Sequence, residues 1–205
     1  MKLILVMLIS YLFGSVPWAL VIGKVFYHKD IRKEGSGNLG ASNAGRVLGK
    51  PAAIAVTLLD GLKGLLSMLV ASLIAKDTVL FAGLACCIGH CFPVFAGFKG
   101  GKAVATSFGF LLGIVLLLDG SWFWQFLLPI LCFFAILYLT KIVSISSISA
   151  LLIVTIVSFV QALQGKMSVS VPLAMAVLWI FVTYRHKDNL VRIKNGTENR
   201  IKWMG

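Results

Sequence analysis

The sequence predicts an all-α integral membrane protein, a bundle of about seven transmembrane helices. Three observations support this fold class: 59% of the 205 residues are hydrophobic, only 13% are charged, and long apolar runs recur along the chain. A typical soluble domain is about 45–50% apolar and roughly 25% charged. A soluble core of this size cannot hide so much apolar surface. The composition also excludes disorder, a fibrous repeat and a secreted disulfide scaffold.

Each predicted span approaches the roughly 20 apolar residues that cross the hydrocarbon core of a bilayer. The segments 103–118 and 171–185 are short, so a tilted or partly interfacial course stays open for them. A five-span arrangement with short re-entrant segments is the main structural alternative. In chain order, the seven predicted spans cover residues 3–24, 51–75, 78–96, 103–118, 122–140, 142–163 and 171–185.

The distribution of Lys and Arg predicts the orientation of these spans. With the N-terminus outside, 15 of the 19 basic residues fall on the inner side, three (Lys2, Lys76 and Lys166) fall outside, and Lys63 lies within a span. Cytoplasmic loops carry the excess of Lys and Arg in membrane proteins. We therefore expect an outer N-terminus and a cytoplasmic C-terminus. The net charge of +12 is then mainly a topology signal, and nucleic acid is not expected as a partner.

The first apolar stretch is too long for a signal peptide and has no small-x-small cleavage site, so we interpret it as a span. No internal repeat divides the sequence, and residues 1–205 are predicted to form a single membrane-embedded domain. The cysteines all lie in predicted spans, which is typical of buried small side chains and not of disulfides. They are Cys86, Cys87, Cys91 and Cys132.

Three polar segments lie on the predicted inner side, over 35–50, 98–109 and 185–200. The first contains a G-x-G-x-x-G pattern, but it lies between two spans and not in a βαβ unit, so it is not a dinucleotide fingerprint. Its glycines allow backbone N–H groups to turn toward an anion. Arg46 adds a bidentate cation. Neutral donors come from Ser36, Asn38, Ser42 and Asn43. We predict a phosphate-binding loop; a solvated loop with helix-capping residues is the alternative.

The second segment contains Gly100-Gly101-Lys102 just before a span. A helix N-terminus at this point would direct free N–H groups toward a phosphate or carboxylate. The segment is not a Walker A loop, because Ala96 and Ala103 replace the required Gly and Ser/Thr. We predict that Lys102 binds an anion, with a plain positive-inside anchor as the alternative.

The third segment is a basic tail, and such tails bind anionic lipid headgroups. That role leaves His186, Asn189 and Glu198 unexplained. His186 and Asn189 are three residues apart, so a helix would place them on one face.

Two opposite charges, Asp60 and Lys63, lie three residues apart within the second span. Charges inside a membrane are costly unless paired, so a structural ion pair is the first interpretation, and a role in holding the inner loops is the second. His90 has only Cys87 and Cys91 as neighbouring metal ligands. We therefore predict no metal and no cofactor.

Several catalytic arrangements are missing. The inner segments carry no paired carboxylates at a usable spacing, no G-x-S-x-G elbow and no His-x4-Asp box. What remains is a set of phosphate-binding loops beside an apolar bundle that would accept an acyl chain between its helices.

These residues resemble the bacterial acyl-phosphate:glycerol-3-phosphate acyltransferases of the PlsY type. Three segments carry the resemblance in the family's order: GSGNLGASN with Arg46, GHCFPVF running on to KGGKAVAT, and His186 with Asn189 and the Gly-Thr-Glu ending at Glu198. Asp60-Gly-Leu-Lys63-Gly and the run from Val143 to Ile148 also fit. Two positions differ: Ser42 replaces the usual Thr and keeps the hydroxyl, and Ala103 stands where the family often has Gly.

The resemblance implies a seven-helix enzyme of the bacterial cell membrane, with its active site facing the cytoplasm. It would transfer a fatty acyl group from acyl phosphate to the 1-hydroxyl of glycerol 3-phosphate, giving lysophosphatidic acid and inorganic phosphate, the first step of phospholipid synthesis. The implied partners are these two substrates, the bilayer and the enzyme that supplies acyl phosphate.

The resemblance also implies roles for individual residues. Catalytic roles fall to Ser36, Arg46, His186 and Asn189, and Glu198 would order the tail. Substrate-binding roles fall to Asn38, Ser42, Gly100, Gly101, Lys102, Ser144 and Ser147, and structural roles to Asp60, Lys63 and His90. Either a substrate phosphate accepts the hydroxyl proton, or Ser36 forms an acyl-enzyme. A transporter of a phosphorylated anion and a lipid-recruiting scaffold are the alternative functions.

Overall fold

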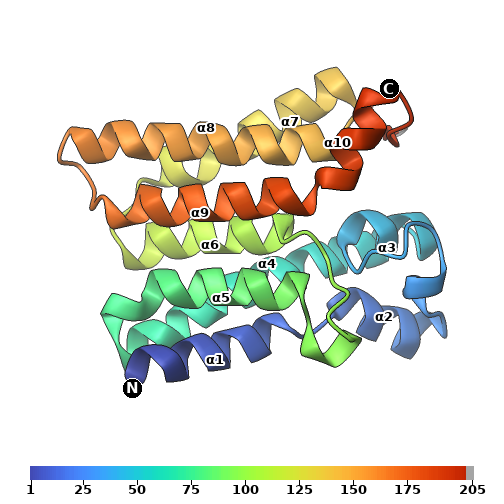
Figure 1. Ribbon diagram of the computed structural model, residues 1–205, viewed down its shortest axis with the longest axis horizontal. Helices are drawn as coiled ribbons and strands as arrows, with labels where there is room; N and C mark the ends of the chain where they lie inside the picture. The colour runs from blue at the N-terminus through green and yellow to red at the C-terminus, as the bar shows by residue number, and fades with distance from the viewer. Residues whose placement is uncertain (202–205) are drawn as a thin grey trace. The chain divides into compact units, whose positions relative to one another are not determined.

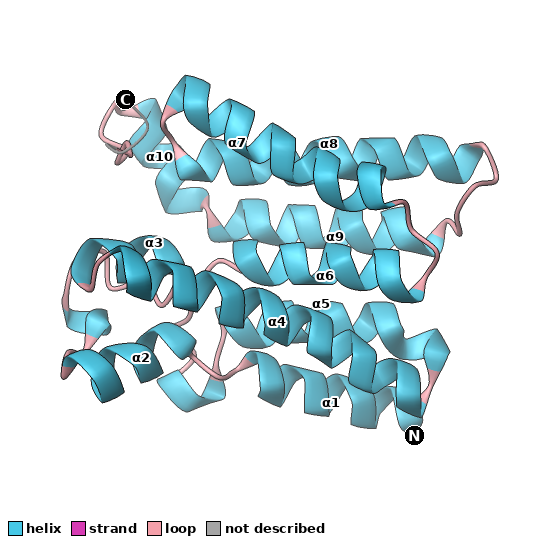
Figure 2. Cartoon of the chain, turned by 180° about the vertical axis from the view of Figure 1, so that it is seen from behind, coloured by secondary structure: helices cyan, strands magenta, loops and turns pink. Residues whose placement is uncertain are grey.

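The computed structural model describes residues 1–201, which form helices joined by loops and contain no strand (Figures 1 and 2). This confirms the all-helical class. The chain folds as two compact units, Met1–Gly113 and Ile114–Gly205, and each is described by itself.

The first unit holds five α-helices and the start of a sixth, with short 3-10 turns between them. In order these elements are α1 Lys2–Gly14, α2 Trp18–Tyr27, η1 Ile31–Lys33, α3 Ala41–Val47, α4 Lys50–Ile74, η2 Lys76–Thr78, α5 Val79–Cys91, η3 Val94–Ala96 and α6 Val104–Leu117. The second unit begins within α6. It continues with the π-helix η4 Trp122–Leu127, then α7 Leu128–Thr140, α8 Val143–Leu163, α9 Ser170–Arg185 and α10 Lys187–Lys194.

The first predicted span is not one continuous helix. α1 ends at Gly14 and α2 begins at Trp18, with Pro17 as its N-cap. Proline has no N–H to donate within a helix, and it disfavours helical backbone at the preceding residue, here Val16. The span predicted over 3–24 is present as Lys2–Tyr27, which is long and apolar enough to cross a membrane, and it consists of two helices broken at Pro17.

Within residues 1–201, five helical stretches have the length and composition of membrane spans. They are Lys2–Tyr27, Lys50–Ile74, Lys76–Ala96, Trp122–Thr140 and Val143–Leu163. The apolar helices α6 and α9 are shorter, with 14 and 16 residues. The chain is thus a multi-pass membrane protein, while the seven crossings and their orientation stay predictions.

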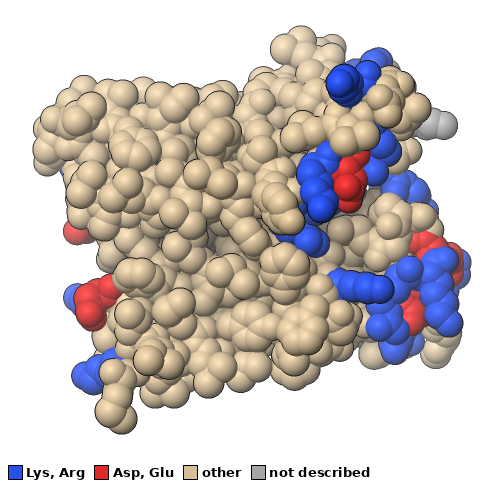
Figure 3. Space-filling model, in the orientation of Figure 1, with Lys and Arg blue, Asp and Glu red and all other residues tan. Residues whose placement is uncertain are grey.

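The helix shafts present apolar side chains outward, as a lipid-facing surface requires. On α4 a stripe of exposed apolar residues recurs every three or four positions: Ile54, Leu58, Leu62, Leu66, Val70 and Leu73. The charges gather elsewhere. On the face drawn in Figure 3, most charged side chains of the first unit lie at the end that carries α2 and α3, with a smaller group at the opposite end, and most of those of the second unit lie near α10. A long exposed apolar stripe of this kind would be an aggregation site in water.

Glycines bring helices of the first unit into backbone contact. A Cβ on Gly109 of α6 would overlap the carbonyl oxygen of Gly61 on α4, and one on Gly64 would overlap that of Thr106. α1 and α5 approach equally closely, because a Cβ on Gly14 would overlap the carbonyl of Cys86. Small residues permit such contacts between membrane helices, where van der Waals packing drives association.

We expect Gly109→Ala to destabilise the protein by about 1–3 kcal/mol, the usual range for overpacking. Gly61→Ala on the facing helix is the matched control, because its new Cβ would lie 3.5 Å from the Ala105 carbonyl oxygen, at ordinary contact distance. Thermal unfolding of the purified variants in detergent compares them. Equal unfolding temperatures for both variants would contradict the close contact between α4 and α6.

Candidate active site

The first polar segment is organised around Asn43, which is 1% exposed. Its Oδ1 accepts a hydrogen bond from the Ser36 backbone N–H at 2.8 Å, and its Nδ2 donates to the Ile31 and Glu34 carbonyl oxygens, each at 3.2 Å. Gly35, with φ +60°, takes the left-handed conformation that this turn requires. One buried amide therefore fixes the shape of the whole loop.

The side chains of this loop that were predicted to contact substrate lie on the surface of the structure. Ser36, Ser42 and Arg46 are exposed. Arg46 lies in the last turn of α3, and its guanidinium has no hydrogen-bonding or ion-pair partner within residues 1–201. A guanidinium left unpaired beside an exposed hydroxyl suits a doubly charged phosphate.

Asn38 joins the first polar segment to the second. Its Nδ2 donates to the carbonyl oxygen of Gly100 at 3.2 Å. Residues 62 positions apart in the sequence thus meet in the first unit, a contact that no local sequence pattern predicts. The contact supports a shared site for the two segments.

The second segment differs from the sequence prediction in one respect. The N–H of Gly100 donates to the Cys91 carbonyl at 3.2 Å, and the N–H of Gly101 donates to the His90 carbonyl at 3.1 Å. These two N–H groups are occupied, so the prediction that they are free for an anion is wrong. The glycines are needed for space, since a Cβ on Gly101 would overlap the His90 imidazole. Lys102 follows them and is half-buried.

Beneath this loop lies a buried charge cluster. Lys63 Nζ lies 2.8 Å from Asp60 Oδ1, and both side chains are at most 3% exposed. His90 Nδ1 lies 3.4 Å from the same oxygen, and Lys63 also donates to the Val16 carbonyl at 3.0 Å. The ion pair predicted from the spacing is present. Because His90 contacts both Asp60 and the loop at Gly101, the cluster also supports the loop.

In the second unit, the third polar segment converges on Glu198. Its carboxylate accepts hydrogen bonds from the Asn189 amide at 2.5 Å, from Arg192 Nε at 2.7 Å and from the Ser144 hydroxyl at 3.3 Å. These donors come from α10 and α8. Burial favours the neutral acid, but the hydrogen bonds from Asn189 and Arg192 outweigh it and hold the pKa of Glu198 below its ordinary value.

His186 and Ser147 are buried beside other partners. His186 stands between α9 and α10, with its Nδ1 2.8 Å from the Val182 carbonyl oxygen. The Ser147 hydroxyl donates to the Val143 carbonyl of its own helix at 2.7 Å. Among the predicted residues of this unit, Ser144 and Asn189 both donate hydrogen bonds to Glu198.

The lowered pKa of Glu198 predicts a pH dependence of stability. A depressed folded-state pKa adds stability that is present above the unfolded-state pKa and lost as pH falls through the folded-state value. We expect wild type to unfold at a higher temperature than Glu198→Gln at neutral pH. This difference should disappear only at a pH below the ordinary range of a glutamate. A difference independent of pH would contradict the assignment.

Two residues of these networks have roles that the sequence did not predict. Asn43 was predicted as a neutral donor for an anion, but its amide is buried and bonded within its own loop. Arg192 was assigned to the basic tail, although its Nε–Oε2 contact makes it a specific partner of Glu198. Within residues 1–201, no three His, Cys, Asp or Glu side chains lie close enough together to hold a metal ion.

Comparison with known proteins identifies the family. A family model described as glycerol-3-phosphate acyltransferase matches residues 4–196. The protein of that name from Enterococcus faecalis is 42% identical, over 99% of this chain and 94% of the relative. The one from Bacillus subtilis is 43% identical over the full length of both chains.

Two solved structures are similar over almost the whole chain. Both are of PlsY, an integral membrane glycerol 3-phosphate acyltransferase, in a glycerol 3-phosphate form and a lysophosphatidic acid form. Their TM-scores are 0.86 and 0.84, with 34% and 33% sequence identity. Each alignment covers 98% of this chain and 96% of the solved chain. The resemblance expected from the three polar segments is thereby confirmed: the chain belongs to the glycerol-3-phosphate acyltransferase family.

Proposed function

We propose that this protein transfers a fatty acyl group from acyl phosphate to the 1-hydroxyl of glycerol 3-phosphate. The hydroxyl oxygen attacks the acyl carbonyl carbon, the bond from that carbon to the phosphate oxygen breaks, and lysophosphatidic acid and inorganic phosphate leave. The observation that carries the proposal is the Asn38–Gly100 hydrogen bond, which joins in one unit the two segments proposed to bind phosphate. The family match and the two substrate- and product-form structures of PlsY support it.

Arg46 and Lys102 are proposed to hold the phosphate groups. Acyl phosphate is already activated, so orientation and charge stabilisation can supply much of the rate enhancement. The exposed Ser36 and Ser42 hydroxyls and the Asn38 amide add neutral hydrogen bonds. Gly100 and Gly101 contribute by close packing, since their N–H groups are already bonded.

The fate of the hydroxyl proton separates two mechanisms. In the substrate-assisted one, a phosphate oxygen accepts it as the new ester bond forms. In the other, Ser36 first takes the acyl group, and its own proton leaves with the phosphate. The glycerol 3-phosphate hydroxyl then attacks the acyl carbon, the ester bond to Ser36 breaks, and the hydroxyl proton passes to Ser36 Oγ. Mass spectrometry of the protein quenched with acyl phosphate alone distinguishes them. An acyl adduct on Ser36 would exclude the substrate-assisted route.

For the second unit we propose that His186 and Asn189 assist catalysis, that Ser144 and Ser147 contact substrate, and that Glu198 orders the tail. The three hydrogen bonds to Glu198 support the last role directly, because they join the tail to α8 and α10. With its amide held by Glu198, Asn189 has a fixed orientation. Such preorganisation benefits a catalytic group.

We further propose that residues 1–205 act as one acyltransferase domain in the bacterial cell membrane, with seven crossings, an outer N-terminus and a cytoplasmic active site. The 15-to-3 distribution of Lys and Arg supports this orientation. A cytoplasmic enzyme that makes acyl phosphate would supply the donor.

The test is an assay of purified protein in detergent micelles with palmitoyl phosphate and glycerol 3-phosphate. Phosphate release should require both substrates and should be lost in Lys102→Ala, while Lys99→Ala, an exposed lysine of the same segment, should retain it. Lysophosphatidic acid is identified by mass spectrometry. No release, together with uptake of glycerol 3-phosphate into proteoliposomes, would favour a transporter.

A further inference from the structure

Two isolated charges of the second unit meet at one cavity. Asp119 is the only acidic residue between Asp77 and Asp188, and Lys166 is the only basic residue between Lys141 and Arg185. Both line a cavity of about 260 Å³, together with Ser121, Trp124, Gln125 and Gln161. None of these residues belongs to the proposed acyl-transfer site.

The wall of this cavity is a hydrogen-bonded structure centred on Gln125. This side chain is fully buried; its Nε2 donates to Ser158 Oγ at 3.0 Å and to Gln161 Oε1 at 2.6 Å. Its Oε1 accepts from the Ser121 N–H at 2.8 Å. Gln125 lies in the π-helix Trp122–Leu127, an uncommon conformation that occurs frequently at functional sites. These hydrogen bonds of Gln125 therefore fix the positions of the residues that form this wall of the cavity.

The two charged residues reach the cavity from turns with unusual backbone. Asp119 has φ +55°, and Gly165, with φ +69°, precedes Lys166. The Lys166 N–H is bonded to the Gln161 carbonyl at 2.9 Å, which fixes the turn at the end of α8. Within residues 1–201 neither charged group has an ion-pair partner, so both keep their full capacity for a ligand.

A second cavity of about 410 Å³ adjoins the first, since Trp124, Gln161 and Lys166 line both. It follows α8 along Ile156 and Val160, which are exposed apolar residues. Exposed tryptophans mark the level where a membrane meets water. A cavity lined by both polar and apolar side chains thus adjoins an apolar groove beside an exposed tryptophan.

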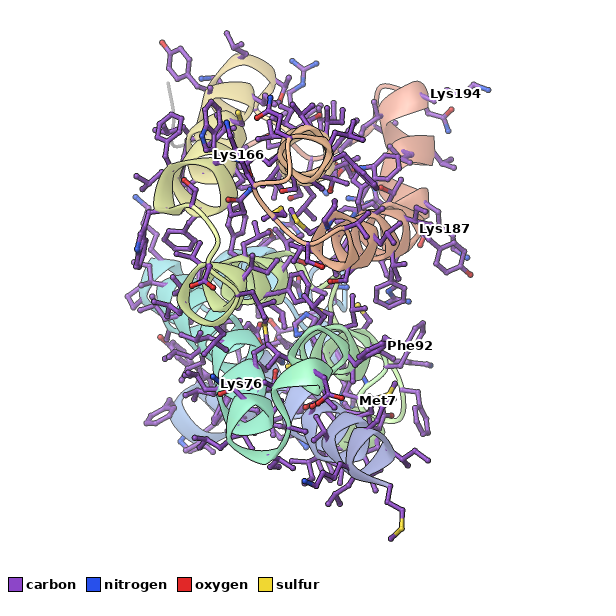
Figure 4. All side chains as sticks on the ribbon, turned by 90° about the vertical axis from the view of Figure 1, so that its left-hand side faces the viewer. Met7, Lys76, Phe92, Lys166, Lys187 and Lys194 are labelled. Carbon is purple, nitrogen blue, oxygen red and sulfur yellow. The ribbon has the colours of Figure 1, made fainter. Side chains whose placement is uncertain are left out.

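The site lies at the end of α8 that is remote from α10. α8 begins beside the tail, where the Ile201 N–H donates to the Lys141 carbonyl at 2.8 Å, and it ends at Leu163, just before Lys166 (Figures 1 and 4). The first cavity is smaller than the roughly 300–1,000 Å³ of sites for drug-sized ligands, and several times the roughly 30 Å³ of a water molecule. Its size suits a small headgroup.

We propose that this cavity binds the headgroup of phosphatidylethanolamine or a lipid of the same chemistry, carrying a phosphate and a primary ammonium. Lys166 pairs with the phosphate, Asp119 accepts hydrogen bonds from the ammonium, and the apolar groove along α8 takes the start of an acyl chain. Each charge of the zwitterionic headgroup thereby faces a side chain of opposite charge, and the acyl chain of the lipid lies in the apolar groove.

Native mass spectrometry of the full chain in detergent tests this proposal. Phosphatidylethanolamine should bind more tightly than diacylglycerol with the same acyl chains, which has no phosphate. Lys166→Gln should weaken binding about fivefold, the effect of one lysine near an anionic lipid group. Lys76→Gln is the matched control, a lysine at a helix connection of the first unit (Figure 4). It should bind like wild type.

The ammonium assignment has its own test. Wild type should prefer phosphatidylethanolamine to phosphatidylcholine, which has the same net charge but no N–H donor, and Asp119→Asn should reduce this preference. Equal or tighter binding of phosphatidylglycerol, or undiminished binding by Lys166→Gln, would overturn the proposal. An inorganic phosphate adduct that depends on Lys166 would also overturn it. Both variants should keep wild-type acyl transfer, which shows that they fold.

Discussion

Replacing Lys63 with methionine should destabilise the protein by about 3–5 kcal/mol, because it leaves the Asp60 carboxylate buried without its closest cation. The two side chains are at most 3% exposed and their charged atoms lie 2.8 Å apart. The buried thiols of Cys86 and Cys87 provide a reporter, since they react with a thiol-specific fluorophore only when the helices separate. The unfolding temperature measured in this way should fall sharply.

Two controls separate this electrostatic effect from simple loss of a side chain. Lys50→Met changes an exposed lysine at the start of the same helix and should leave the unfolding temperature nearly unchanged. Adding Asp60→Asn to Lys63→Met removes the uncompensated charge and should recover much of the loss. If the double variant is no more stable than Lys63→Met, the Asp60 charge is not the cause.

Replacing Arg46 with alanine should lower kcat/KM for acyl transfer by about 10–150-fold. A hydrogen bond to a charged group contributes about 1.5–3 kcal/mol, which corresponds to this range. Arg46→Lys should recover only part of the activity, because an ammonium cannot bind phosphate through two parallel hydrogen bonds. Phosphate release in micelles with both substrates measures the effect.

Arg32→Ala is the matched control for this experiment. Arg32 is another exposed arginine of the first unit, but its guanidinium is engaged by Asp30 at 2.6 Å. Its loss should leave kcat/KM close to the wild-type value. Equal losses for Arg32→Ala and Arg46→Ala would indicate a general effect of positive charge and would contradict a specific phosphate contact at Arg46.

Features determined by local spacing were predictable from the sequence. The Asp60–Lys63 pair is one, because residues three apart on a helix face each other and a buried charge needs a partner. The break at Pro17 was also within reach, since proline at this position disfavours a continuous helix. The hydropathy of the stretch predicts a span over 3–24, and it carries no information on whether the helix within that span is continuous.

Features that depend on distant partners were not predictable. Nothing in Gly100-Gly101 indicates that their N–H groups are bonded to His90 and Cys91, because the turn that returns the chain to α5 is set by tertiary packing. The sequence likewise gave Asn43 and Ser42 the same polar character, yet one is 1% exposed and the other lies on the surface. A sequence shows which groups can form hydrogen bonds, but it does not show which partners they bind in the folded protein.

The contact between Lys63 and the Val16 carbonyl bears on how the chain is made. During translation, Val16 at the proline break after α1 is synthesised first. Asp60 and Lys63, on one turn of α4, follow, and His90 is synthesised last. When α4 enters the bilayer, both the carboxylate and the carbonyl that hold its lysine have therefore already been synthesised. The buried cation has its two partners before α5 has been translated, so the costliest charge of the first unit can be neutralised early in membrane insertion.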